Sequence, residues 1–201
     1  MKLLAFVDLH SNTHDLKKII EISKKEKPDF LVCAGDISDF GQHITDIFKT
    51  LENLKIPMLI IPGNHETDKE IHELCKKFKF AIDIDRGCYE INDYCFLGYG
   101  GGGFSIEDQD FEDLAKKFKK YIKENPNKKI ILVVHAPVYK TKTDYLSNLG
   151  HQGNKAIRNF IEEIQPKLVL CGHFHDTART MDKIKQTLII NTGSPGQIII
   201  I

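Results

Sequence analysis

The feature that most constrains the fold is an alternation of short apolar runs and amphipathic stretches in the first third of the chain. Residues 3–7, 30–34 and 58–61 are apolar runs of the length expected for buried strands. Between them, residues 14–25 and 44–54 place apolar side chains at helical spacing. This β-α-β-α-β order predicts parallel strands joined by helical crossovers.

The remaining two thirds add a hairpin to this pattern. Two short runs, residues 88–91 and 94–99, are separated by Asn92-Asp93, a two-residue joint that suits a hairpin. We expect further helices at 68–78, 111–121 and 154–164, and further strands at 130–134, 168–170, 187–190 and 197–201. A chain of 201 residues suits one domain with a sizeable core. The sequence therefore predicts a single mixed α/β domain over residues 1–201.

Composition argues against several classes of protein. Lys+Arg and Asp+Glu both total 28, and this balance is unlike the basic excess of a dedicated binder of long nucleic acid, although a local basic strip is compatible with it. The first apolar run is too short for a signal peptide, and no segment approaches the roughly 18 apolar residues of a membrane span. None of the five cysteines forms a CxxC pair, which favours reduced thiols. We expect a soluble cytoplasmic protein with no membrane partner.

Five polar clusters follow five of the predicted strands, each at the point where the strand ends. They are Asp8-Leu9-His10, Gly35-Asp36-Ile37-Ser38-Asp39, Gly63-Asn64-His65-Glu66, His135 and Gly172-His173-Phe174-His175. Any one of them alone is explained by an ordinary turn or helix cap. In α/β sheets, however, ligands bind at the carboxyl ends of the strands, where five such clusters can converge. Together they predict one functional site.

The residue types in these clusters point to metal chemistry. Two carboxylates, four imidazoles and one amide oxygen suit Mn, Fe, Zn, Ni or Co better than Mg or Ca. Seven candidate ligands exceed the four of a single tetrahedral zinc, which indicates two ions. Two neighbouring cations can clamp an in-line phosphoryl displacement and lower the pKa of water between them. The candidates are Asp8, His10, Asp36, Asn64, His135, His173 and His175.

In this order, the motifs D-x-H, G-D-x-x-D, G-N-H-[DE], a lone His and G-H-x-H resemble those of the calcineurin-like metallophosphoesterase superfamily. The segment His151-Gln152-Gly153-Asn154 resembles the small stand-alone prokaryotic members of that superfamily. The resemblance implies a four-layer α/β/β/α sandwich with two mixed sheets. It also implies two divalent metal ions per chain, manganese being the first expectation, with Asp36 bridging them. One ion would be held by Asp8, His10, Asp36 and His175, and the other by Asp36, Asn64, His135 and His173.

The same resemblance implies roles for three further residues. His65 would contact the substrate phosphate and help protonate the leaving group, while Asp39 and Glu66 would orient histidines or loops from behind the ligands. Two other residues stay open on the sequence alone. Asn12 could reach a substrate phosphate or simply cap a helix, and His151 could meet substrate or merely begin a helix.

The function that follows is a dinuclear metal-dependent phosphodiesterase or phosphatase, in which a metal-bridging hydroxide attacks phosphorus and His65 assists the leaving group. The expected partner is a small-molecule phosphoester such as a nucleotide. Two alternatives remain on the sequence alone: a non-catalytic scaffold on the same fold, and a nuclease of the same chemistry. The oligomeric state is not predicted.

Overall fold

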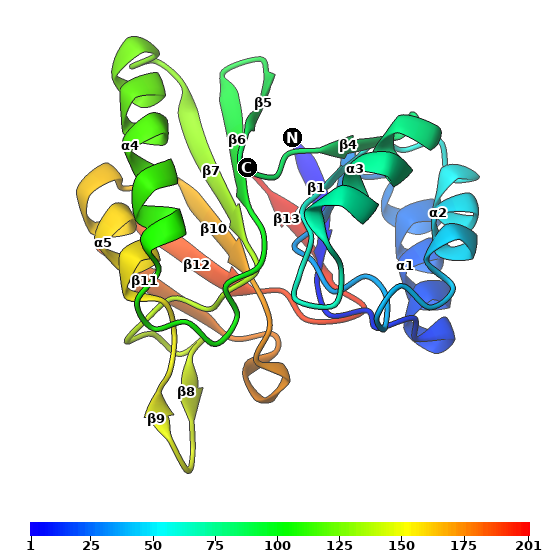
Figure 1. The fold of residues 1–201 in the computed structure, drawn as a ribbon. Coiled ribbons are helices and arrows are strands. Elements are labelled where there is room, and N and C mark those ends of the chain that lie inside the picture. The colour runs from blue at the N-terminus through cyan, green and yellow to red at the C-terminus, as the bar shows by residue number, and fades with distance from the viewer.

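The computed structural model describes residues 1–201, and two large β-sheets packed face to face form its centre (Figure 1). The first sheet has the strand order β13-β1-β2-β3-β4 and is parallel except for β13 at one edge. Its strands are β1 (Lys2–Phe6), β2 (Phe30–Cys33), β3 (Met58–Ile60), β4 (Ala81–Asp83) and β13 (Gln197–Ile200).

The second sheet has the order β11-β12-β10-β7-β6-β5, with four parallel central strands and an antiparallel strand at each edge. Its strands are β5 (Cys88–Ile91), β6 (Tyr94–Tyr99), β7 (Lys129–Val134), β10 (Leu168–Cys171), β11 (Met181–Ile184) and β12 (Thr187–Asn191). A separate two-stranded hairpin, β8 (Tyr145–Leu146) and β9 (Gly150–His151), extends from the end of the molecule where β7 and β10 terminate (Figure 1).

Five α-helices cover the outer faces of the two sheets (Figure 1). The first sheet is covered by α1 (Thr13–Glu26), α2 (Ile44–Glu52) and α3 (Asp68–Lys77), and the second by α4 (Gln109–Glu124) and α5 (Lys155–Ile164). A single 3₁₀ turn, η1 (His175–Thr177), follows β10. The predicted four-layer α/β/β/α arrangement is confirmed. No helix of the protein combines the length and apolar character needed to cross a membrane.

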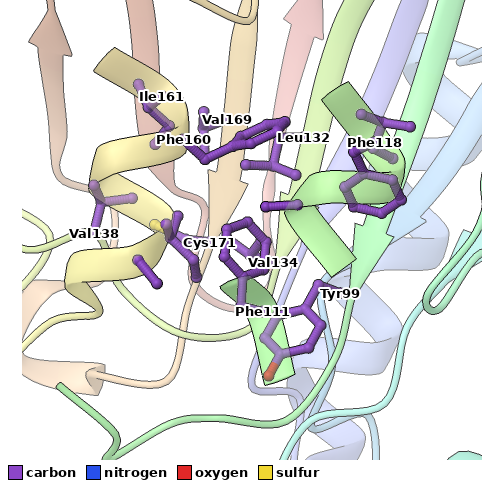
Figure 2. Close-up of a cluster of buried hydrophobic side chains, with 14 of the residues drawn as sticks. Tyr99, Phe111, Phe118, Leu132, Val134, Val138, Phe160, Ile161, Val169 and Cys171 are labelled. Carbon is purple, nitrogen blue, oxygen red and sulfur yellow. The ribbon is translucent and has the colours of Figure 1, made fainter. Parts of the chain in front are cut away.

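Burial on both faces explains why the central strands read as continuous apolar runs. In β2, Phe30 and Val32 belong to the layer between the sheets, whereas Leu31 and Cys33 pack under the helices of the first sheet. The matching layer under α4 and α5 contains 20 buried residues. Figure 2 shows Phe111 and Phe160 of these two helices meeting over the second sheet, with ring centroids 5.7 Å apart in an edge-to-face arrangement.

Helix starts follow the local sequence. The Asn12 side chain accepts hydrogen bonds from the backbone of His14 and Asp15, which begins α1. Thr67 and Glu70 form a reciprocal capping box at α3. The predicted helix at 154–164 begins one residue later, with Asn154 as its cap. The structure adds strands that the pattern did not predict, including β4 and β11, because these short edge strands carry charged residues and lack a continuous apolar run.

Candidate metal centre

The predicted site residues meet at the carboxyl ends of the central strands of both sheets. Loops after β1, β2 and β3 come from the first sheet, and loops after β7 and β10 come from the second. They surround a pocket of about 440 Å³. Its lining consists of His10, Asp36, Asp39, Asn64, His65, Phe104, His173 and His175. The sheets therefore bring polar residues that are distant in sequence to one place.

Asp36 lies at the centre of this group and is only 2% exposed. Its Oδ2 is 3.4 Å from His135 Nε2 and 3.7 Å from His10 Nε2, while its Oδ1 accepts a hydrogen bond from the His65 backbone at 2.9 Å. Burial acts to raise the pKa of Asp36, but the His135 imidazole and the His65 amide outweigh it and lower that pKa to about 2. A buried, ionised carboxylate therefore faces several imidazoles.

Three groups of side chains bring their potential ligand atoms within 4.8 Å of one another. Asp36 belongs to two of these groups, one with His135 and His173 and the other with His10 and His65. The third group is Asp8, His10 and His175. A carboxylate shared between neighbouring groups of ligand atoms is able to bridge two cations.

His135 shows most clearly that the donor set suits a cation. Its ring is fully buried, and Nδ1 lies 2.9 Å from the Ala34 carbonyl, which can only accept a hydrogen bond. Nδ1 therefore donates, and Nε2 faces Asn64 Oδ1 at 2.9 Å as well as the Asp36 carboxylate. Three atoms with lone pairs meet there, and a cation shared between them would satisfy all three.

Three buried side-chain atoms of the site residues have no hydrogen-bond partner: Asp8 Oδ1, His65 Nδ1 and His173 Nε2. The Asp8 and His173 atoms belong to candidate ligands. Burial, together with the charge of His135, lowers the pKa of His173 to about 4, which keeps its ring neutral and able to bind a metal. Buried polar atoms normally have partners, so these two fit ligands of a metal ion.

The backbone of the site loops is strained. Asp8, His10, Asp36 and His173 all have φ between 45° and 70°, a region that non-glycine residues seldom adopt. Such strain concentrates where function needs a particular side-chain geometry. Glycine is also required at position 63, which lies against Asp36 in space, because a Cβ on Gly63 would overlap Asp36 Oδ1.

Glu66 joins the loops that follow β2 and β3. It is 7% exposed, and its carboxylate accepts hydrogen bonds from the backbone of Asp36 and Gly63 and from both the backbone and the hydroxyl of Ser38, at 2.8–3.1 Å. Glu66 thus fixes the backbone on either side of Asp36 without lining the pocket.

His65 lies at the rim of the pocket, with Nε2 4.0 Å from Asp36 Oδ2. Its Nδ1 is 3.2 Å from Asp39 Oδ1. One ring nitrogen of His65 therefore lies beside the Asp39 carboxylate and the other beside the candidate ligands.

Asn12 and His151 do not line this pocket. The Asn12 Oδ1 is engaged in capping α1. His151 lies in β9 rather than at a helix start, and its Nδ1 is 2.7 Å from Oδ1 of the buried Asp144. Conversely, Phe104 lines the pocket although it was not predicted. The signal available in the sequence was an aromatic residue directly after Gly100-Gly101-Gly102-Gly103.

Comparison with known proteins agrees with this geometry. The family model described as calcineurin-like phosphoesterase matches residues 1–177. An uncharacterised protein of Methanocaldococcus jannaschii is 34% identical over 95% of this chain and 87% of its own length. A probable glycerophosphodiester phosphodiesterase of Arcobacter nitrofigilis is 26% identical over 94% of this chain and 71% of its own. A probable cyclic nucleotide phosphodiesterase of Ruthia magnifica is 28% identical over 83% of this chain and 71% of its own length.

Solved structures show the same fold. A Thermus thermophilus protein superposes with a TM-score of 0.73 at 15% identity, covering 96% of this chain and 88% of its own. At that level of identity the likeness concerns the architecture alone.

Proposed function

The chain belongs to the calcineurin-like phosphoesterase family and is a metal-dependent phosphoesterase; from this premise we propose that it uses two divalent cations to hydrolyse a small phosphodiester or phosphomonoester. The observation that carries the proposal is the position of Asp36, which belongs to two of the three groups of potential ligands. We assign one cation to Asp8, His10, Asp36 and His175, and the other to Asp36, Asn64, His135 and His173.

Bound at these positions, the cations would supply a nucleophile at neutral pH and neutralise charge on the phosphoryl oxygens. The protein residues do the rest. Asp36 and the neutral ring of His173 provide ligand atoms without a change in protonation. Glu66 accepts one hydrogen bond from the Asp36 amide and three more from Ser38 and Gly63, which fixes the loops around the left-handed backbone of Asp36.

We assign the proton donor to His65. Its Nε2 faces the candidate ligands at the rim of the pocket, and its Nδ1 lies 3.2 Å from Asp39 Oδ1. A positioned general acid contributes about 10²- to 10⁴-fold to the rate. Removal of the imidazole should therefore reduce turnover by that factor and leave the assigned ligands in place.

A phosphodiester is the favoured substrate class, because two of the relatives carry phosphodiesterase names. Manganese as the native metal and a cytoplasmic location stay predictions from the sequence.

The test compares p-nitrophenyl phosphate with bis-p-nitrophenyl phosphate across Mn, Fe, Ni, Co and Zn, with the metal content measured by elemental analysis. We expect His65→Ala to keep two metal ions per chain and to lose about 10²- to 10⁴-fold in kcat. Asp36→Asn should lose both metal and turnover. His72→Ala is the matched control, since His72 is exposed on α3 away from the pocket.

Three results would overturn the proposal. They are full activity of either site variant, one metal ion per chain at saturation, and wild-type protein that is inactive on both esters with every metal. The last result would favour the scaffold alternative.

A further inference from the structure

Two phenylalanines are exposed beside the candidate centre, where burial would normally be favoured. Phe104 is 81% exposed and Phe40 is 71% exposed. Six large hydrophobic side chains of the protein are exposed, and Phe104 and Phe40 are the only phenylalanines among these six. Single exposed apolar residues are common on protein surfaces, so exposure alone carries little meaning. The positions of these two rings beside the candidate centre are more informative than their exposure.

Phe104 is the one hydrophobic side chain among the eight residues that line the pocket. Its ring meets that of His173 edge to face, with centroids 4.4 Å apart. An edge-to-face contact at one side leaves most of the ring open to a ligand, in agreement with its high exposure.

The chain holds Phe104 in place from both sides of the glycine-rich loop. The Gly100 amide donates to Asp85 Oδ1 at 2.7 Å, and Asp108 accepts a hydrogen bond from the Tyr99 hydroxyl at 2.9 Å. Gly103 packs directly on His173, since a Cβ there would come within 2.5 Å of the imidazole. The loop therefore crosses the site closely and presents the next residue, Phe104, at its edge.

Phe40 reaches the same centre from the other sheet. It stacks on His65 with centroids 3.9 Å apart and an interplanar angle of 23°. Its φ of 48° is a left-handed backbone conformation that is costly for a bulky residue. The two aromatic side chains come from the β2–α2 loop and the β6–α4 loop, which belong to opposite halves of the sandwich (Figure 1).

We propose that Phe104 and Phe40 are specificity-determining residues, and that the substrate carries a planar aromatic group, as a nucleobase does, beside the phosphoester. This inference rests on the proposed function and narrows its substrate class. A polar pocket that holds the phosphoryl group gains little from exposed phenyl rings, whereas a planar ring system gains by stacking on them. An ester of small aliphatic alcohols would leave both rings without a partner.

The test uses two diesters that share one leaving group: thymidine 5′-(4-nitrophenyl phosphate) and methyl 4-nitrophenyl phosphate. Stacking of a base on one aromatic side chain strengthens binding by a factor of roughly 5 to 100. The wild-type kcat/KM should therefore be higher for the thymidine ester than for the methyl ester by roughly 5-fold or more. Phe104→Ala should remove most of this preference, measured as the ratio of the two kcat/KM values, and Phe40→Ala should reduce the ratio as well. Ile200→Ala is the control, because Ile200 is 78% exposed but pairs with Lys2 at the opposite end of the first sheet.

A second measurement separates failure of the inference from failure of the proposed function. Calorimetric titration of manganese-loaded His65→Ala protein compares adenosine 5′-monophosphate with ribose 5-phosphate, which has a hydroxyl group in place of the base. We expect tighter binding of the nucleotide, by roughly 5- to 100-fold, and loss of the difference when Phe104→Ala is added. This binding assay needs no turnover, so it applies even where neither diester is hydrolysed.

Equal affinities for the two ligands, or a preference between the diesters that Phe104→Ala leaves intact, would overturn the inference and leave the phosphoesterase proposal standing. An equal loss on both diesters with reduced metal content would also overturn it, because Phe104 would then only support His173.

Discussion

Glu66 offers the sharpest test of how the fold builds the site. Glu66→Ala removes the acceptor of four hydrogen bonds, three of them from the backbone amides of Asp36, Ser38 and Gly63. The Ser38 hydroxyl can rotate to another acceptor, but the three amides cannot. Each buried amide left without a partner costs about 1–3 kcal/mol. We therefore expect the free energy of unfolding to fall by about 3 kcal/mol or more.

Glu66→Gln should cost less, because one carboxylate oxygen is retained. The amide nitrogen is best placed beside Ser38, where the hydroxyl can accept from it and only the Ser38 backbone N–H loses its partner. The expected loss is about 1–3 kcal/mol. Burial raises the pKa of Glu66, so the charge of the native residue is itself costly and its removal offsets part of the loss.

The assay is urea unfolding at pH 7 followed by circular dichroism, on protein treated with chelator so that bound metal does not contribute. Glu73→Gln is the matched control on α3, where an exposed carboxylate pairs with Lys76 and a change within about 0.5 kcal/mol is expected. If both Glu66 variants unfold within 0.5 kcal/mol of wild type, the loops after β2 and β3 do not depend on this carboxylate.

Two further predictions concern pH and metal. Burial raises the pKa of Asp85 to about 6 despite the hydrogen bond from Gly100. The native state therefore binds this proton more tightly than the unfolded state, and stability should fall as pH rises from about 4 to 6, by up to about 3 kcal/mol. Asp85→Asn should remove that slope in urea unfolding between pH 4.5 and 7, and an unchanged slope would contradict the assignment. Removal of metal with a chelator should lower the melting temperature reversibly, because a ligand present at 100 times its Kd stabilises the native state by about 2.7 kcal/mol. In Asp36→Asn, added manganese should no longer raise the melting temperature. Equal melting temperatures of the wild-type protein with and without manganese would count against metal binding.

Much of the fold could be predicted because buried strands and helices place apolar residues in characteristic patterns along the sequence. The runs at 88–91 and 94–99 match β5 and β6 in their bounds, and the asparagine caps of α1 and α5 lie at or next to their predicted positions. The sequence did not reveal β4 or β11, because an edge strand of three or four residues with one polar face resembles a loop. The layering of two sheets depends on contacts between distant segments and came from the family resemblance alone.

The sequence nominated candidate site residues, which stay predictions as ligands, but it did not indicate their geometry. Five motifs at strand ends were enough to nominate the candidate ligands, because parallel strands place their carboxyl ends together. No local pattern indicates that Asp36 and His173 adopt left-handed backbone, since asparagine and glycine are the usual occupants. Phe104 was not predicted either: it directly follows four glycines, but an aromatic residue is more often buried than exposed.

The split of the site between the two sheets has a consequence for how the protein acquires its cofactor. Residues from Asp8 to Glu66 belong to one half of the chain and those from His135 to His175 to the other, so neither half alone brings Asp36, His135 and His173 together. High-affinity metal uptake should therefore occur only after the sheets have docked, late in folding. A cation bound there would hold the halves to each other as a long-range cross-link does, and slow metal release would make the native state persist longer than its apolar layers alone would allow.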